Sequence, residues 1–556
     1  MGVPSLYRTL VHKYETIQEK SRDKIEYLFL DLNCLMHHCL HSITDDLNHR
    51  EMEEAIIIEV VRYAVFLVTK VVMPTRLVYI AMDGSVPVSK MERQRSALFK
   101  KTQDMSFTFK MRKKYGITET KKFDSNKFYP GTIFMSKLNA RLKNFITFGA
   151  FATHTNKQSC FKVIYSDTNV PCEGKYKIFD FLRHVQTEPK ILVYGMDADF
   201  IILSMASNKK NIKLMREASN IDKTIKYDFV CIDIEKCKRF LYDDYISDDL
   251  KYNLPIDAFI SDFVVYSMFS GNDFVHALPH CKVRNGGLEK LIRAYVVTYS
   301  FLNKPLVNSE NKIQFDFLNM FFRRLSDSED IAMKRSTNKR IYSKDRMTYE
   351  KEVELYEYAD YSSPNNPYHT YYKNTLTLID YSNEYSSWVA QYNAHFFEAP
   401  MDDVIREYIK SVIWTHSYYK GALESWTYYN IYRTSPTLHS LSTFFHQTHL
   451  DPVFEIDTVL SPLEQLMYVL PFQSSKLLPY ALQEMMTDED SPIQNCYPIT
   501  SSLDVLSGGK NIDSAAILPK IHIPDIRHVV CNVPLNDHDI MRNTITYDVF
   551  HKTFTK

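Results

Sequence analysis

The early part of the chain contains three short apolar runs that lack polar alternation: I-E-Y-L-F-L-D (25–31), R-L-V-Y-I-A-M-D (76–83) and K-I-L-V-Y-G-M-D (190–197). Such runs are typical of parallel strands that are buried on both faces of a sheet. The segments between them, such as residues 52–68 and 178–185, have the length or periodicity of crossover helices. The pattern therefore predicts an α/β fold with a mostly parallel central sheet flanked by helices.

The pattern changes in the second half of the chain. Residues 303–367 are polar, charged and poor in pattern, and we interpret them as an inserted or mobile connection. From about residue 371 the chain is rich in tyrosine and helical in pattern, and after Pro498 it becomes loop-rich and strand-like. We expect a core over residues 1–302, a variable connecting segment over 303–367, and a helical second region over 368–556 with a loop-rich end.

Composition narrows the class of protein. The 556 residues are 45% hydrophobic, as in a globular protein, and 67 basic residues balance 67 acidic ones. Any affinity for nucleic acid must therefore come from local basic patches. The apolar stretch 56–82 is interrupted by four charged residues and a proline, which a membrane span would not tolerate. We expect a soluble, cytoplasmic monomer that does not bind a membrane.

Nine cysteines form no C-x-x-C pair, and Cys34, Cys39, Cys172 and Cys281 lie in or beside apolar segments. This placement is typical of reduced, buried thiols and indicates a reducing compartment.

Each of the three apolar runs ends on an aspartate: Asp31, Asp83 and Asp197. Because open α/β sheets bind ligands at the carboxyl ends of their strands, we expect these side chains to meet. Asp199 follows in M-D-A-D-F, where strand alternation would place it on the same side as Asp197. Asp273 stands in the turn S-G-N-D, whose glycine permits a tight bend.

Glu173 stands between a loop and a predicted helix in V-P-C-E-G-K-Y-K-I, and it is either a helix cap or a metal ligand. A single acid in such a place is more often a cap or a turn residue. Six acids together favour a metal site, because hard cations such as magnesium take oxygen ligands and offset the repulsion between carboxylates. Such a site suits the attack of water on a phosphodiester, with two metal ions stabilising the attacking and leaving oxygens.

Basic and aromatic residues alternate between Lys100 and Lys143, as in F-K-M-R-K-K-Y-G. Such a run is either a solvated helical face or a nucleic-acid surface, and the sequence does not decide between them.

Several longer motifs occur in a fixed order along the chain. They are M-G-V-P-S-L-Y-R, D-L-N-C-L-M-H-H-C, M-D-G-S-V-P-V-S-K-M-E-R-Q-R, F-D-S-N-K-F-Y-P-G-T-I-F-M, V-P-C-E-G-K-Y-K-I, Y-G-M-D-A-D-F-I, F-S-G-N-D-F-V-H-A-L-P, Y-Y-K-G-A-L-E-S-W-T-Y-Y and P-L-E-Q-L-M-Y-V-L-P. In these motifs the chain resembles the Xrn-type 5′ to 3′ exoribonucleases, within the flap-endonuclease-like (PIN-like) nuclease superfamily. The resemblance covers residues 1 to about 300 and 370–525.

The resemblance implies magnesium-dependent, processive 5′ to 3′ degradation of single-stranded, decapped RNA with a 5′ monophosphate, in mRNA turnover. It implies two Mg²⁺ ions, for which Mn²⁺ can substitute. The matching acids, expected to act in catalysis and to hold the metal, are Asp31, Asp83, Glu173, Asp197, Asp199 and Asp273.

The resemblance also assigns substrate-binding residues. Lys90 and Gln94 match the pocket for the 5′ phosphate, and His37 matches a histidine that stacks on the terminal base. Trp426 lies on an aromatic segment that walls off the channel in the family. For His37 and Trp426, a place in the core is the alternative. Arg93, Arg95, Lys100 and Lys101 are close enough in sequence to add positive charge to the phosphate pocket.

The chain departs from the family at two places. Lys175 stands where the family has a second glutamate, and either takes the place of one cation or marks a weakened second metal site. The alternative function is therefore a weakened or inactive nuclease-like RNA-binding protein. Ala97 and Leu98 replace an arginine pair and weaken the predicted phosphate pocket. A structure-specific DNA nuclease is a third alternative, which the second-region motifs disfavour.

Overall fold

The computed structural model describes the chain in segments. They are residues 3, 5–14, 17–19, 24–43, 49–117, 123–149, 151, 161–195, 197–218, 229–336, 348–358, 379, 381–444, 450, 452–504 and 514–554.

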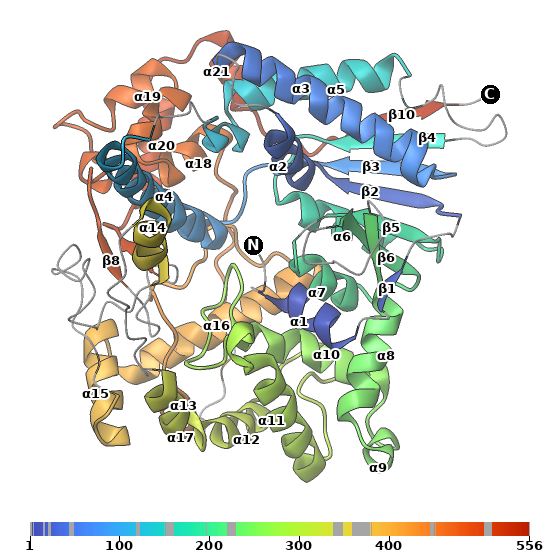
Figure 1. Ribbon diagram of the computed structural model, residues 1–556, viewed down its shortest axis with the longest axis vertical. Coiled ribbons are helices and arrows are strands. Elements are labelled where there is room, and N and C mark those ends of the chain that lie inside the picture. The colour runs from blue at the N-terminus through green and yellow to red at the C-terminus, as the bar shows by residue number, and fades with distance from the viewer. Residues whose placement is uncertain are drawn as a thin grey trace.

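A sheet in the strand order β1-β7-β6-β5-β2-β3-β4-β10 lies in the right half of the view in Figure 1. Its strands are β1 (Gln18–Glu19), β2 (Tyr27–Asp31), β3 (Leu77–Ala81), β4 (Phe161–Ser166), β5 (Ile191–Tyr194), β6 (Ile212–Glu217), β7 (Phe229–Asp233) and β10 (Phe550–Phe554). The strands from β6 to β4 run parallel, and the pairs that involve β7, β1 or β10 are antiparallel. The three predicted strands are the neighbours β5, β2 and β3, so the predicted mostly parallel sheet is confirmed.

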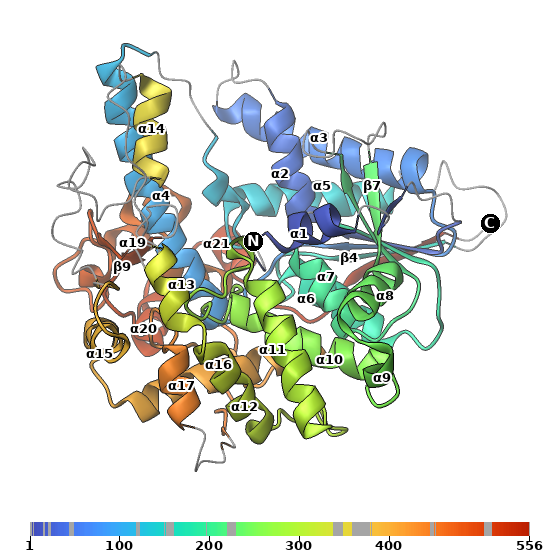
Figure 2. The same ribbon diagram turned by 60° about the horizontal axis from the view of Figure 1, so that its bottom comes forward.

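Helices cover both faces of this sheet (Figures 1 and 2). One face carries α2 (Leu32–Ser42), α3 (His49–Phe66), which continues as a π-helix (Leu67–Val72), and α5 (Ile133–Thr147). The other face carries α1 (Leu6–Lys13), α6 (Gly174–His184), α7 (Asp199–Ala206), α8 (Ile234–Tyr245) and, beyond them, α9 (Asp248–Lys251), α10 (Ile256–Ser267), α11 (Gly287–Leu302), α12 (Phe315–Ser326), α16 (Met401–Lys420) and α17 (Leu438–Phe444). Each helical layer forms a hydrophobic core with the face of the sheet that it covers. Leu28 and Leu30 of β2 pack in the core on the side of α2, α3 and α5, whereas Phe29 packs in the core on the other side. The strands lack polar alternation because neither face meets water.

The segment 303–367 differs from the expected loose connection. It contains α12, α13 (Glu329–Ser336) and α14 (Tyr349–Tyr358), and Phe317, Phe321 and Phe322 of α12 are fully buried. The apolar residues of α12 recur at helical spacing. Because the flanking residues are polar, the composition of the whole segment does not reveal this helix. The remaining parts of this connection, residues 337–347 and 359–367, lie outside the described residues.

We expect Phe321→Ala to lower the thermal unfolding midpoint clearly, because truncating a buried phenylalanine costs about 3–5 kcal/mol. The Phe321 ring is 0% exposed and lies 5.8 Å from the Phe269 ring, centroid to centroid. Phe301→Ala removes the same ring from a position that is 69% exposed, and it should leave the midpoint nearly unchanged. Differential scanning fluorimetry of the two variants tests the packing of α12, and equal shifts would contradict it.

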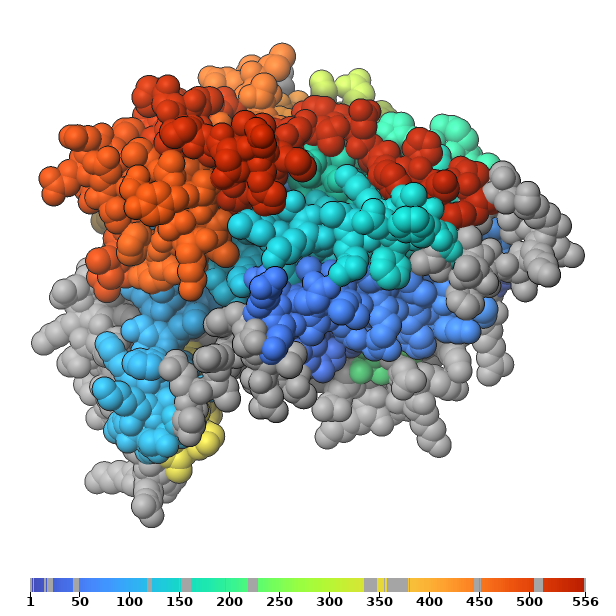
Figure 3. Space-filling model, turned by 90° about the horizontal axis from the view of Figure 1, so that it is seen from above, coloured from blue at the N-terminus to red at the C-terminus, as the bar shows by residue number. Residues whose placement is uncertain are grey.

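The C-terminal part of the chain packs around α4 (Val88–Lys114) in a separate hydrophobic cluster. The elements of this C-terminal part are α18 (Pro462–Val469), α19 (Tyr480–Glu484), α20 (Ile523–Asn532), α21 (Asp537–Arg542), β8 (Ser502–Asp504) and β9 (Ala515–Ile517). A smaller hydrophobic cluster joins α15 (Tyr385–Phe396) to α13. The strand-like pattern expected after Pro498 is present in β8, β9 and β10, but α20 was not predicted. In Figure 3 the C-terminal end (red) lies along the cyan part of the chain, where β10 pairs with β4.

α4 extends away from the body of the protein, and α14 runs beside it (Figure 2). The rings of Phe107 and Tyr356 stack between these helices with centroids 3.7 Å apart. Part of the basic and aromatic run that begins at Lys100 therefore serves packing. Among the described helices, none is long and apolar enough to cross a membrane.

Candidate active site

A pocket of about 520 Å³ opens at the carboxyl ends of β2, β3 and β5. Asp31 is the last residue of β2, and Asp83 and Asp197 lie in the loops that follow β3 and β5. All three line the pocket, together with Glu173 and Lys175. The structure thus brings the strand-end acids together, as the sequence predicts.

Asp31 and Asp83 are fixed by hydrogen bonds to the starts of neighbouring helices. Asp31 caps α2, where its carboxylate accepts from the backbone N–H of Asn33 at 3.0 Å. The Asp83 carboxylate accepts from the backbone N–H of Gly174 at 2.6 Å, while the Asn33 side chain accepts from the Asp83 N–H at 3.0 Å. The thiol of the half-buried Cys34 lines the pocket and donates to Asp31 at 3.0 Å. Cys39, Cys172 and Cys281 are buried free thiols, as predicted.

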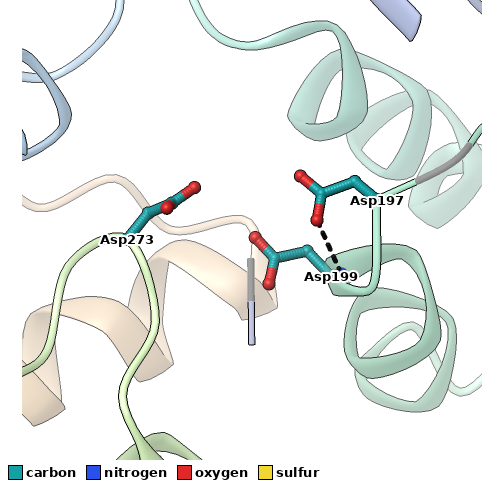
Figure 4. Close-up of side chains that lie close together, drawn as sticks. All are labelled: Asp197, Asp199 and Asp273. Carbon is teal, nitrogen blue, oxygen red and sulfur yellow. Dashed lines mark hydrogen bonds between the residues drawn. The ribbon is translucent and has the colours of Figure 1, made fainter. Parts of the chain in front are cut away.

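Asp197, Asp199 and Asp273 offer carboxylate oxygens that lie within 4.8 Å of one another (Figure 4). The geometry differs from the expected strand alternation, because β5 ends at Tyr194 and Asp199 is the first residue of α7. The Asp199 N–H donates to the Asp197 carboxylate at 3.2 Å, so the turn into the helix sets their distance. Asp273 follows Gly271, whose φ of 89° makes the tight bend that the sequence predicts.

Glu173 occupies the N-cap position of α6, but its side chain makes no capping hydrogen bond. Instead its carboxylate accepts from the Tyr418 hydroxyl at 3.0 Å and pairs with Lys90 Nζ at 2.7 Å. The helix-cap interpretation of this side chain is therefore wrong, and Glu173 joins the acidic cluster.

Two buried lysines lie among the six acids. Lys175 Nζ is 2.5 Å from Asp199, 3.2 Å from Asp197, 3.6 Å from Asp273 and 3.7 Å from Glu173. Lys90 pairs with Glu173 and Asp273. The family resemblance assigns Lys90 to the phosphate pocket, and in the structure Lys90 lines the same pocket as Asp31, Asp83, Glu173 and Asp197.

The electrostatics divide the acids into two groups. Burial, followed by the nearby carboxylates of Asp83 and Asp197, raises the pKa of Asp31 to about 7. Burial, followed by the charge of Glu173, also raises the pKa of Asp83. Burial acts in the same direction on Glu173 and Asp273, but neighbouring cations, chiefly Lys175 and Lys90, lower the pKa of each.

Asp197 belongs to the second group, since Lys175 leads the cations that outweigh burial and lower its pKa. The pKa of Asp199 rises to about 6, because burial prevails over the attraction of Lys175. The negative charge that lysine compensates least thus lies at the Asp31 and Asp83 end of the site.

This donor set fits a hard divalent cation. Every acid offers carboxylate oxygens, the ligands that such ions prefer. If all six carboxylates are ionised, the two ammonium groups leave four negative charges to be balanced, and this repulsion contributes, after burial, to the raised pKa values of Asp31, Asp83 and Asp199. The arrangement is compatible with divalent metal binding, and the oxygens of Asp31 and Asp83 are those with the least competition from lysine.

Among the predicted substrate-binding residues, His37, Gln94 and Lys101 line the same pocket as the acids. The His37 ring meets the Phe128 ring edge-on at 5.2 Å, and Lys101 donates to the Ser125 hydroxyl at 2.7 Å. Ala97 and Leu98, the departures from the family, line the pocket too. These positions of α4 share one helical face, because they recur at spacings of three and four.

Arg95, Lys100 and Trp426 do not line this pocket. The buried Arg95 guanidinium donates to the backbone carbonyls of Pro519 at 2.8 Å and Cys496 at 2.7 Å, so it holds the C-terminal part against α4. Lys100 pairs with Asp104 one turn along the helix, at 2.6 Å. These two positions differ from the prediction because nearness in sequence does not place residues on the same helical face.

The half-buried Trp426 sits in a loop where its N–H donates to Asp457 at 2.6 Å and its carbonyl accepts from the Val88 N–H at 2.8 Å. Its backbone thus anchors the start of α4.

Four further residues, three of them in the second region, complete the site and were not predicted from the sequence. Tyr418 contacts Glu173, and the Tyr419 hydroxyl accepts from the Asn272 side chain at 3.2 Å. The Gln465 side chain lines the pocket and accepts from the Val86 N–H at 2.9 Å. The Val3 N–H donates to Asp199 at 3.0 Å. All four lie within the quoted motifs, and that is the signal by which they could have been found.

The fold and the site define a class: an α/β protein with a carboxylate-lined pocket at the carboxyl ends of parallel strands, compatible with a divalent cation and closed by a helical second region. The sequence model of the XRN 5′-3′ exonuclease N-terminus matches residues 1–218, and that of the Xrn1 helical domain matches residues 253–374 and 385–551. The chain therefore belongs to the XRN 5′-3′ exonuclease family. The helical-domain match begins upstream of the boundary expected at residue 303.

Curated relatives agree with this assignment. The chain is 26% identical to human 5′-3′ exoribonuclease 1, over 98% of this chain and 35% of the relative. It is 23% identical to the Saccharomyces cerevisiae 5′-3′ exoribonuclease 1, over 93% of this chain and 42% of the relative. Against Candida albicans 5′-3′ exoribonuclease 2 the identity is 23%, over 94% of this chain and 71% of the relative. The chain thus spans less than half the length of the first two relatives.

Among solved structures, the catalytic core of Rad2 in complex with a DNA substrate matches 76% of this chain and 99% of its own, with 13% identity and a TM-score of 0.28. No argument rests on a likeness at that score.

Proposed function

We propose that the protein is a divalent-metal-dependent 5′ to 3′ exoribonuclease that degrades single-stranded RNA processively to mononucleotides. The observation that carries the proposal is an acidic cluster in a member of the XRN family: four carboxylates line one pocket, and those of Asp199 and Asp273 lie within 4.8 Å of the carboxylate of Asp197. We further propose that magnesium is the natural ion, that manganese can replace it, and that decapped messenger RNA in the cytoplasm is the substrate.

In this proposal the acids hold the metal, which supplies positive charge where negative charge develops on the phosphodiester oxygens. The residues of α4 that share the pocket, Gln94 and Lys101, bind the terminal phosphate. His37 offers a flat partner to the first base. Tyr418 orients Glu173 through its hydroxyl.

The presence of Lys175 is evidence that the site holds fewer metal ions than the family pattern implies. A glutamate replaced by a lysine changes the local charge by two, which is the charge of one divalent cation. Lys175 Nζ also lies among the oxygens of Asp197, Asp199 and Asp273, the group that could otherwise hold an ion. We propose that Lys175 takes the place of one cation and that the remaining ion binds at the Asp31 and Asp83 end.

The place of Lys175 among the acids also favours the second candidate function, a nuclease-like protein that binds RNA without cutting it.

A comparison of substrates separates the candidate functions. Single-stranded RNA and a flapped DNA of the same sequence, each with a 5′ monophosphate, are incubated with the protein and magnesium. We expect nucleotide release from RNA at a rate at least tenfold above that from DNA. Faster cleavage of the flap would indicate a structure-specific DNA nuclease, and binding without cleavage would indicate the inactive alternative.

We expect Ala97→Arg to strengthen the preference for a 5′ monophosphate over a 5′ hydroxyl, by about tenfold in the ratio of kcat/KM values. Ala97 is exposed and lines the pocket, so an arginine there can reach the terminal phosphate, and a charge-assisted hydrogen bond contributes about 1.5–3 kcal/mol. Ala140→Arg, an exposed alanine on α5, is the matched control and should leave the ratio unchanged. An unchanged ratio in Ala97→Arg would place the 5′ end elsewhere.

A further inference from the structure

A second cavity, of about 220 Å³, lies on the opposite side of α4 from the acidic pocket. Ser89, Glu92, Arg93 and Ser96 line it, whereas Lys90, Gln94 and Ala97 line the acidic pocket. The two sets alternate along α4 at helical spacing, so this helix forms a wall between the cavities. The opposite wall of the second cavity comes from residues 429–433 and 515–520.

Positive charge is in excess in this second cavity. Arg93, Arg95, Arg433 and Lys520 line it, against Glu92 and Asp273. Both carboxylates have partners outside the cavity, since Glu92 accepts from the Tyr468 hydroxyl and Asp273 pairs with Lys90. Arg433 likewise pairs with Asp504 at 3.6 Å, so the excess positive charge comes from Arg93, Arg95 and Lys520. Arg93 and Lys520 are exposed, and neither forms an ion pair among the residues that the structure describes.

Two buried donors in the lining lack an acceptor. The Nη atoms of Arg95 bind backbone carbonyls, but its buried Nε–H has no partner in the described part of the chain, and neither has the buried Nδ2 of Asn430. Arg95 is 2% exposed, so an acceptor reaches its Nε–H only when side chains of the lining move aside. Buried donors left unpaired are costly, and they mark places where a ligand supplies the acceptor.

Aromatic side chains complete the lining. Tyr429, Tyr432 and Phe274 join the cationic residues, so the cavity combines donors for a phosphate with flat faces for a base. Asp273 belongs to the lining of this cavity and to the acidic cluster at once, which places the cavity next to the position where the reaction would release its product.

We propose that this second cavity binds a nucleoside 5′-monophosphate, with the phosphate on Arg93, Arg95, Asn430 and Lys520. The inference rests on the proposed function for the origin of the nucleotide, since an exoribonuclease produces this ligand on the other side of the Asp273–Lys90 pair. Occupation of the cavity would then slow turnover as product accumulates.

Binding of AMP by isothermal titration calorimetry in EDTA tests the proposal, with adenosine and inorganic phosphate as separate arms. EDTA removes divalent ions, so the result does not depend on whether the protein cleaves RNA. We expect Arg93→Glu/Lys520→Glu to raise the Kd for AMP at least tenfold. Both side chains are exposed, so their replacement leaves the fold intact. Lys210→Glu, an exposed charge reversal on another loop, should leave the Kd unchanged.

Asn430→Leu is the second variant, and it should weaken AMP binding without changing the net charge. The proposal is overturned if the unaltered protein does not bind AMP at millimolar concentration, or if both variants bind it as tightly as the unaltered protein. Loss of AMP binding in Lys101→Glu alone would place the nucleotide in the acidic pocket and contradict the assignment. Inorganic phosphate that binds as tightly as AMP would overturn recognition of a nucleotide.

Discussion

Asp273→Asn is expected to lower the rate of RNA degradation by about 10³-fold or more. The amide keeps the shape of the side chain but removes one charge from the acidic cluster that we propose holds a divalent cation, and the loss of several kcal/mol of charge stabilisation corresponds to about this factor. Asp273 contacts both Lys90 and Lys175, so its loss leaves each ammonium group with fewer carboxylate partners, and both then compete with the metal for the remaining acids. Initial rates of mononucleotide release from labelled RNA measure the effect.

Asp257→Asn is the matched control for this prediction. Asp257 lies exposed in the first turn of α10, and its replacement should leave the rate unchanged. Circular dichroism should show the same secondary structure in both variants. Full activity in Asp273→Asn would remove the acidic cluster from the mechanism.

Lys175→Glu is expected to make the stability of the protein strongly dependent on divalent metal. Removing the cation of a buried ion pair costs about 3–5 kcal/mol, because its carboxylate partners lose their compensation. In EDTA the unfolding midpoint of the variant should therefore fall well below that of the unaltered protein. Added magnesium should restore it, and equilibrium dialysis should show about one more bound divalent ion per chain.

The activity of Lys175→Glu decides between the two roles of this lysine. A variant that gains activity would identify Lys175 as a lesion in an RNA-binding protein, whereas a variant with equal or lower activity would show that the lysine has been adopted into the mechanism. Lys210→Glu serves again as the exposed charge reversal, which should change neither the midpoint nor its response to magnesium. Equal midpoints of Lys175→Glu and the unaltered protein in EDTA would contradict the ion pairs of Lys175.

The centre of the fold and the gathering of the acids could be predicted from the sequence because both follow from local patterns. An apolar run that ends on Asp31 or Asp83 indicates a buried parallel strand and the edge at which its last carboxylate lies. The helix α12 was missed because polar residues on its exposed face lower the mean hydropathy of the whole segment, although Phe317 and Phe321 are one turn apart.

Side-chain partners were the part that the sequence could not supply. Arg95 follows Gln94 directly, yet one binds backbone carbonyls of the C-terminal part and the other faces the acidic pocket, because a helix turns successive residues by about 100°. Likewise β10 joins the sheet from the far end of the chain, and nothing local to β4 announces that pairing. Contacts between distant segments depend on the packing of the whole chain.

The most direct test of the account is the digestion of single-stranded RNA that carries a labelled 5′ monophosphate, with and without magnesium. If the protein is a 5′ to 3′ exoribonuclease, labelled mononucleotide is released from the first moments of the reaction and no short labelled fragments form. This release should require the metal. Tight binding of the RNA without cleavage, at any magnesium or manganese concentration, would contradict this function.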